Sequence, residues 1–357
     1  MERDRETAGQ SPASTPRAER ARRQVRPTSA ALAGLLALAL GLAACGGEDG
    51  DGGQAEQGSD TDYARAIEAA QTVSAADFPS ARGRTLQQIA DQVRQVQGGL
   101  ATSEFTPGVN RLAFGVIGDD NKFVYGKSAV YLAPTPQALA QGPFPAPADP
   151  LVVDPPFRSK GAALESDAIA AIYEARVRLP KPGRYAALLA TKTRSGLVGA
   201  PAQIQVRRSS GIPQVGERPP DIETDTVASA GGDIESIETR VPPDEMHEVS
   251  FKDVVGKQPV ALLFATPALC QTRVCGPVTD IAAQMQKEYG DEMAFIHQEV
   301  YEDNTVAKGL REQLRAFGLR TEPWLFTFDR DGRVAARLEG SFGNGAFERS
   351  IRAALDQ

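Results

Sequence analysis

The last third of the chain alternates between apolar strands and amphipathic helices in an order that few folds can accommodate. The predicted elements are the strand "PVALLFAT", the helix "GPVTDIAAQMQKEYG", the strand "MAFIHQEV", the helix "NTVAKGLREQLRAFGL" with Asn304 as its cap and Gly318 as its stop, the strands "PWLFTFD" and "VAARLEG" joined at "RDGR", and the helix "AFERSIRAALDQ". The order βαβαββα requires parallel strands joined by helical crossovers, followed by an antiparallel hairpin.

This order resembles the thioredoxin superfamily over residues 246–357, because a cysteine stands where the first helix begins and a proline precedes the third strand. Cys275-Gly276-Pro277 coincides with the first three residues of the family's Cys-Gly-Pro-Cys motif, and Glu322-Pro323 falls where the family keeps its cis-proline. The resemblance implies that Pro323 lies against the reactive sulfur and frames the substrate site. Val278 occupies the place of the family's second cysteine, so a resolving thiol can only be Cys270, upstream of the helix.

A cysteine at a helix N-terminus faces unpaired backbone N–H groups and the positive end of the helix dipole, which lower the pKa of its thiol. The thiolate is the species that attacks a disulfide. We therefore expect thiol–disulfide exchange, with Cys275 as the attacking thiol and Cys270 as its partner. Glu322 opposes thiolate formation if its carboxylate lies near the sulfur, and Arg273 favours it.

Other interpretations of the two cysteines remain open. In one, Cys270 and Cys275 form a permanent disulfide in a non-catalytic binding or scaffold protein. In another, the chain resembles the Sco-type copper chaperones, whose two cysteines and distal histidine bind copper. Neither His247 nor His297 stands at that family's position, so we expect no metal ligand and no cofactor. A peroxiredoxin-like interpretation is weaker, since Pro267 is one residue too far upstream.

The N-terminus has the features of an export signal. Arginines precede the apolar run "SAALAGLLALALGLAAC", which ends in Leu42-Ala43-Ala44-Cys45. That tetrapeptide resembles the bacterial lipobox, in which the cysteine is lipidated and becomes the new N-terminus. We expect Cys45 to anchor the protein to the extracytoplasmic face of the bacterial cell membrane. Residues 46–62 are rich in Gly and acids and predict a disordered tether.

The net charge limits the classes of partner that we expect. The formal net charge is −7, and residues 1–44 contribute +3 from seven Arg and four acidic residues, which leaves −10 from Cys45 onward. An acidic protein without a basic cluster is not expected to bind nucleic acid or to adhere electrostatically to anionic lipid. The expected partners are protein thiols or disulfides as substrate, and the membrane through the lipid at Cys45.

The middle of the chain predicts a second module. Leu112, Phe114 and Val116 share one face of a strand, "FVYGKSAVYL" follows as another, and Tyr173 begins a similar alternation to Leu179. Further strands are predicted at "RYAALLATKT" and "AQIQV", whereas the Pro-rich segment at 134–156 predicts a surface loop. The strand rhythm predicts a β-sandwich that is similar to the immunoglobulin-like modules of bacterial envelope proteins.

The sequence therefore predicts a multidomain chain, an immunoglobulin-like β-sandwich followed by a thioredoxin-like α/β fold, with a short helical N-terminal lead-in. The expected segments are a signal peptide (1–44), a tether (45–62), a helical lead-in with Thr85 as a possible cap (63–104), the β-sandwich (105–207), a linker (208–245) and the thioredoxin-like domain (246–357).

Overall fold

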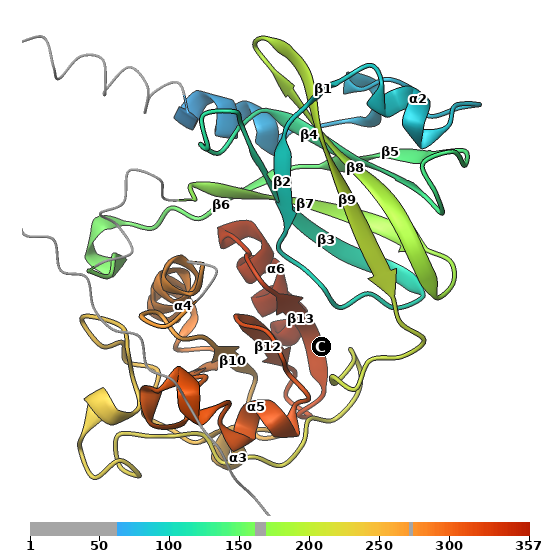
Figure 1. Ribbon diagram of the computed structural model, residues 1–357. Helices are drawn as coiled ribbons and strands as arrows, with labels where there is room; N and C mark the ends of the chain where they lie inside the picture. Colours follow the sequence, from blue (N-terminus) through green and yellow to red (C-terminus); the bar gives the residue numbers. More distant parts are fainter. Residues whose placement is uncertain (1–62, 161–168, 271–273) are drawn as a thin grey trace, which may run out of the picture. The chain divides into compact units, whose positions relative to one another are not determined.

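The computed structural model describes residues 63–160, 169–270 and 274–357. The predicted signal peptide, Cys45 and the predicted tether lie outside these residues, so the predictions made for them are not addressed by the structure. Within the described residues, every helix is too short or too polar to cross a bilayer. The described chain is a multi-sheet α/β protein (Figure 1).

Two sheets form what we call the two-sheet module, residues 94–206. The five-stranded sheet has the order β1-β9-β8-β4-β5, and the four-stranded sheet has the order β2-β3-β7-β6. The strands are β1 (Arg94–Gln95), β2 (Gln97–Leu100), β3 (Gly108–Ile117), β4 (Lys127–Ala133), β5 (Gln141–Ala146), β6 (Ala148–Pro150), β7 (Ala171–Leu179), β8 (Gly183–Thr193) and β9 (Gly196–Val206). All pairs are antiparallel except β1 with β9.

The two sheets share one apolar core. Leu112, Phe114 and Val116 of β3 are fully buried in it, as their alternation predicts, and Tyr173 of β7 packs against Phe114 with 5.2 Å between ring centroids. Side chains of β4, β8 and β9 fill the core from the opposite sheet. The predicted shared face of Leu112, Phe114 and Val116 is therefore confirmed, but the opposite face of β3 is not exposed there, since Ala113 is buried in a second core.

Two predictions for the surroundings of the module are wrong. The Pro-rich segment forms strands β5 and β6 instead of a loop, because each is the edge strand of its sheet, where proline's missing N–H is tolerated. In the lead-in, residues 63–71 are helical and Thr85 caps α2 (Leu86–Ala90), but the expected second helix ends there. Residues 94–100 form β1 and β2, since Gly98 packs so closely on Ala200 that a Cβ atom would lie 2.6 Å from that side chain.

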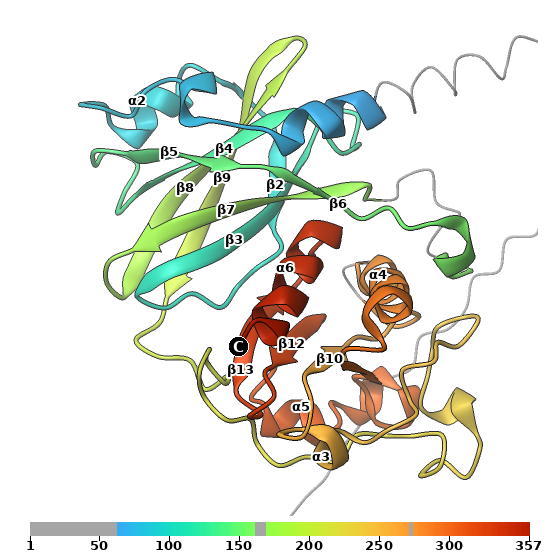
Figure 2. The same ribbon diagram turned by 180° about the vertical axis from the view of Figure 1, so that it is seen from behind.

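The C-terminal unit, residues 246–357, has a four-stranded sheet of order β11-β10-β12-β13. Its elements are α3 (Phe251–Val254), β10 (Val260–Phe264), α4 (Cys275–Tyr289), β11 (Ala294–Gln298), α5 (Glu312–Ala316), β12 (Trp324–Phe328), β13 (Val334–Glu339) and α6 (Asn344–Leu355). Successive β10 side chains enter two separate cores, shared with α4 and α6 on one face and with α3 and α5 on the other (Figures 1 and 2). The predicted element order is confirmed.

The second crossover differs from its prediction. The sequence predicts one helix over residues 304–319, but this segment contains only short turns, η4 (Glu302–Asn304) and η5 (Val306–Lys308), before α5. Asn304 and Gly309 have positive φ angles, which an α-helix excludes. Strand β12 runs antiparallel to β10, so β12 starts at the same end of the sheet at which β11 stops. The chain therefore does not have to return along the sheet through a long helix.

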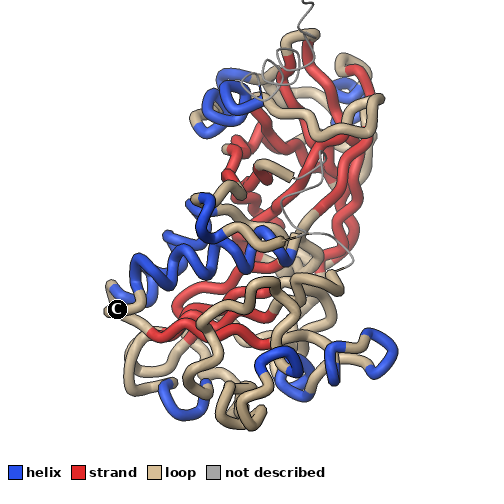
Figure 3. Tube along the Cα trace, turned by 90° about the vertical axis from the view of Figure 1, so that its left-hand side faces the viewer, coloured by secondary structure: helices blue, strands red, loops and turns tan. Residues whose placement is uncertain are grey.

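The predicted linker packs on the C-terminal unit. It has no strand and one short turn, η3 (Ile234–Ser236), yet Ile212 and Ile222 are buried in the core beneath α5. Figure 3 shows the resulting contrast: most of the two-sheet module is strand, whereas the other half combines helices, strands and long loops.

Polar contacts join the two-sheet module to the C-terminal unit. Asp149 of β6 accepts hydrogen bonds from the amides of Gly343, Gly345 and Ala346 at the start of α6, at 3.1, 2.8 and 2.9 Å. Arg111 of β3 donates to the carbonyl oxygens of two residues at the end of β13 and beyond it, Glu339 and Ser341. The two parts therefore complete each other's hydrogen bonding.

The surroundings of Glu174 at this junction lead us to expect that the stability of the fold decreases at acid pH. Burial alone would raise its pKa, but the guanidinium groups of Arg111 at 2.8 Å and Arg349 at 3.2 Å outweigh burial and lower the pKa. Ionised Glu174 therefore stabilises the fold above its ordinary pKa of about 4.3, and this stability is lost as the pH falls through the lower folded-state pKa. Urea unfolding measured from pH 6 to pH 3 tests this. The free energy of unfolding should fall less with acidification in Glu174→Gln than in wild type, while the control Glu68→Gln, at an exposed residue, should follow wild type.

Candidate functional site

The two cysteines lie together where α4 begins, in the segment that follows the end of β10. Helix α4 buries Val278 and Ile281 against the sheet, and this seats its first residue, Cys275, in the same core. The amide of Cys275 donates to the sulfur of Cys270, with 3.4 Å between nitrogen and sulfur. Cys275 has no exposed surface, whereas Cys270 is half-buried. Of these two cysteines, Cys270 is thus the one that reaches solvent.

The expected lowering of the Cys275 pKa is wrong. Burial raises the pKa of this thiol well above its usual value, the neighbouring Cys270 raises it further, and the Glu322 carboxylate adds a smaller effect in the same direction. A hydrogen bond from the Thr266 backbone opposes these effects without overcoming them. The position at the helix N-terminus is as predicted, but desolvation dominates. Arg273, the expected compensating charge, lies outside the described residues.

Pro323 is preceded by a cis peptide bond, as expected, and leads directly into β12. The residue before it, Glu322, accepts a hydrogen bond from the Tyr301 hydroxyl at 3.4 Å. Burial raises the pKa of Tyr301 to about 12, with the Glu322 carboxylate contributing, so this phenol stays protonated at neutral pH. Tyr301, which the sequence did not single out, therefore orients Glu322 beside the cysteines. Trp324, the next residue, is buried in the core.

A largely apolar cavity of about 310 Å³ adjoins this site. Val274, beside Cys275, and Glu322, beside Pro323, line it from the C-terminal unit. The two-sheet module supplies most of the opposite wall, through the side chains of Leu100, Ile117, Phe123 and Ile172. An apolar cavity with a few polar groups at its edge is suited to bind a small ligand or a short length of peptide.

Comparison with known proteins gives a distant similarity. No family model and no curated protein matches the chain. Among solved structures, a thiol:disulfide interchange protein of the thioredoxin family from Chlorobium tepidum TLS has 17% identity and a TM-score of 0.29, covering 40% of this chain and 98% of its own. The exposed lipoprotein thioredoxin Etrx1 from Streptococcus pneumoniae has 16% identity and a TM-score of 0.26, covering 37% and 98%.

About 40% of the chain is thus distantly similar in structure to thioredoxin-family proteins. The structure itself brings Cys270 and Cys275 into contact and places Pro323 directly before β12. A Cys-x-x-Cys pair is absent from the sequence of this region.

The two histidines do not lie where the copper-chaperone interpretation requires them. His247 and His297 come together with Glu238 and Asp244, and this potential metal-binding group, found among the described residues, includes no cysteine. No sequence signal marks it, because three of the four residues belong to segments without helix or strand.

Proposed function

We propose that the thioredoxin-like region carries out thiol–disulfide exchange through Cys270 and Cys275, with protein thiols or disulfides as substrate. The observation that carries this proposal is the contact between the two cysteines at the start of α4, with 3.4 Å between the Cys275 amide and the Cys270 sulfur. A pair of adjacent thiols can give up two electrons and two protons as it passes from dithiol to disulfide, and recover them on reduction. No cofactor is needed for this chemistry.

The exposure of the sulfurs supports a reversal of the roles expected from sequence. Cys270, which reaches solvent, attacks the substrate disulfide as a thiolate, and one substrate sulfur leaves and takes up a proton. Cys275, sheltered behind it, then loses its proton and attacks the Cys270 sulfur of the mixed disulfide. The second substrate thiol is released, and Cys270–Cys275 becomes a disulfide that an external dithiol must reduce. The high pKa of Cys275 favours its protonated form until that second step.

The proposal predicts different fates for two single variants, made in the full chain with Cys45→Ser so that no third thiol remains. Both Cys270→Ser and Cys275→Ser should lose turnover with a protein disulfide substrate and dithiothreitol. With the substrate disulfide and no dithiothreitol, Cys275→Ser should accumulate a mixed disulfide with the substrate, because attack occurs and resolution does not. Cys270→Ser should form little adduct, because its remaining thiol is buried. Mass spectrometry of acid-quenched reactions measures both species.

The same variants separate the alternatives. If the adduct accumulates in Cys270→Ser instead, Cys275 is the attacking thiol and the roles return to those expected from sequence. If neither variant forms an adduct and the wild-type pair has a reduction potential below about −300 mV, the bond is structural and the exchange proposal is wrong. Unfolding curves of both variants check that the loss of turnover is not a loss of folding.

We further propose that the protein is a lipoprotein, anchored through Cys45 on the extracytoplasmic side of the bacterial membrane. The tetrapeptide Leu42-Ala43-Ala44-Cys45 after an apolar run supports this location. We also propose that the two-sheet module is an immunoglobulin-like β-sandwich, which the common core of its two sheets supports. Its place along the cavity beside Val274 suggests a role in holding the substrate.

A further inference from the structure

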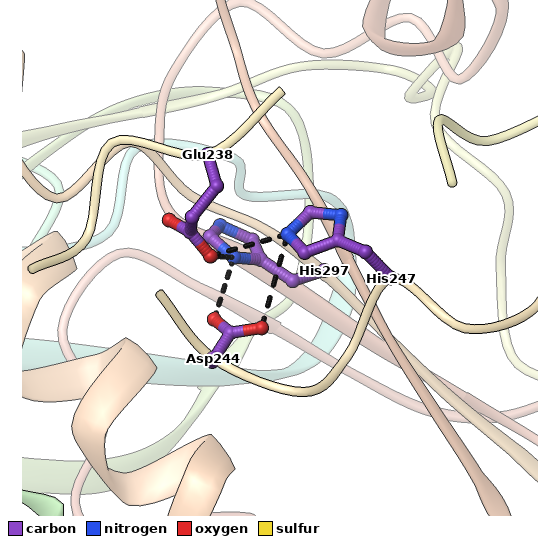
Figure 4. A group of neighbouring side chains, drawn as sticks. All are labelled: Glu238, Asp244, His247 and His297. Carbon is purple, nitrogen blue, oxygen red and sulfur yellow. Dashed lines mark hydrogen bonds and ion pairs between the residues drawn. The ribbon is translucent and has the colours of Figure 1, made fainter. Parts of the chain in front are cut away.

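Two histidines and two carboxylates converge in the C-terminal half of the chain, in what we call the histidine–carboxylate cluster (Figure 4). Its members are Glu238, Asp244, His247 and His297. His297 comes from β11, and the other three come from the loops between η3 and α3. One ligand atom from each side chain lies within 4.8 Å of every other.

Hydrogen bonding at His297 leaves an electron-rich centre. Its Nε2 lies 3.2 Å from the carbonyl oxygen of Ala265, which can only accept, so this nitrogen carries a proton. In a neutral ring Nδ1 then holds a lone pair, and it faces the Glu238 Oε2 atom at 3.1 Å and an Asp244 oxygen at 2.9 Å. Three lone pairs cannot face one another at these distances unless a proton or a metal ion lies between them.

The charge balance favours the metal ion. The four side chains are at most 1% exposed, so the two carboxylates have almost no contact with water. Protons alone balance the two carboxylates only if both histidines are charged, with 5.2 Å between their ring centroids, and like charges this close in a buried site repel each other. A divalent cation neutralises both carboxylates.

The spacing fits a small tetrahedral ion. Ligand atoms at about 2.0–2.2 Å from zinc are separated from each other by roughly 3.3–3.6 Å in a tetrahedron. Here Glu238 Oε2 is 3.1 Å from both His247 Nε2 and His297 Nδ1. Asp244 meets the histidines through different oxygens, Oδ2 at 2.9 Å from His297 Nδ1 and Oδ1 at 3.8 Å from His247 Nε2, and one ligand atom from each residue lies within 4.8 Å of the others. Imidazole nitrogens combined with carboxylate oxygens suit zinc and its neighbours in the first transition series.

Backbone groups around the cluster hold its side chains in fixed orientations. Ala265 fixes the ring of His297, the Arg240 amide donates to Glu238, and the Met246 amide donates to Asp244. Metal-bound histidines and carboxylates are commonly held in this way by backbone groups. We propose that the histidine–carboxylate cluster binds one divalent ion of the zinc class. The ion fastens the 238–247 segment to the edge of the sheet, beside the strand end that leads to Cys270.

The test is zinc binding to the full chain with Cys45→Ser after removal of metal by a chelator, measured by competition with a chromophoric chelator. We expect one zinc per chain, a higher melting temperature with zinc, and more than about a 100-fold loss of affinity in His247→Ala and in Asp244→Asn, since loss of a ligand should exceed the effect of losing an outer contact. The neighbouring exposed-residue control Glu248→Gln should bind as wild type.

Two further measurements keep the result decisive if a cluster variant does not fold. Cobalt bound to the unmodified cluster should give the visible absorption of a tetrahedral ion without a thiolate charge-transfer band. Zinc binding should also survive in Cys270→Ser/Cys275→Ser. The proposal is overturned if wild type binds no stoichiometric zinc, if zinc leaves its melting temperature unchanged, or if binding disappears with the cysteines, which would place the metal at the thiols.

Discussion

Replacing Arg240 by methionine is expected to lower the free energy of unfolding by about 3–5 kcal/mol. The Arg240 side chain is only 5% exposed, and its Nε donates to Asp280 of α4 at 2.9 Å. Its terminal nitrogens donate to the carbonyl oxygens of Pro242 and Phe157, at 2.6 and 2.7 Å. Methionine fills a similar volume but leaves a buried carboxylate without its counter-charge, and two carbonyls without donors.

Urea unfolding of Arg240→Met measures this loss, and Arg218→Met, at an exposed arginine, is the matched control. The double variant Arg240→Met/Asp280→Asn should recover part of the loss, because no charge then remains buried and the introduced amide oxygen still accepts the hydrogen bonds from Ser159. A loss below about 1 kcal/mol in the single variant would mean that water reaches Asp280, contrary to the burial of this pair.

Asp149→Ala should cost about 2–4 kcal/mol, the combined effect of a lost helix cap and buried donors left unsatisfied. Asp149 lies in β6, far from α6 in sequence, yet it accepts from three amides at the start of that helix. It therefore serves as the N-terminal cap that Gly343, which has no side chain, cannot provide. Thermal and urea unfolding should both show a single transition at lower stability.

Asp154→Ala is the control for this prediction, because Asp154 is exposed in the same segment and its side chain makes no capping bond. Asp149→Asn should fall between wild type and Asp149→Ala, since an amide keeps one acceptor oxygen but loses the negative charge that the helix N-terminus favours. If Asp149→Ala instead separates unfolding into two transitions, the contact holds the two parts together without being needed for α6 itself.

Local patterns predict the C-terminal unit well. Every β10 residue is buried, and runs such as this one are bounded by turn residues that mark where strands stop. The errors arise where long-range pairing decides the outcome. Residues 94–100 have helical spacing but complete two sheets, and the prolines of β5 are accommodated only because that strand is at an edge. Both outcomes depend on pairing with strands that are distant in sequence, so a short stretch of sequence does not reveal them.

The sequence predicts where the residues of the candidate site lie, but not the pKa of its thiol. The placement of Cys275 at a helix start, and of Pro323 before β12, follows from local signals. The raised pKa of Cys275 does not, because burial depends on how α4 packs. The histidine–carboxylate cluster escapes sequence-based prediction for a similar reason: His297 meets Glu238 only after an irregular loop has folded against the sheet.

The cavity beside Val274 has a consequence for which proteins could be clients of the proposed exchange. Its volume of about 310 Å³ is at the small end of ligand sites, and residues from both halves of the molecule line it. Neither Cys270 nor Cys275 lines the cavity, so the reacting disulfide itself need not enter it; a single extended strand of chain fits, whereas a compact domain does not. If the substrate of the proposed exchange lies partly in this cavity, its bound part is an extended segment, so we expect unfolded polypeptides to react faster than folded domains.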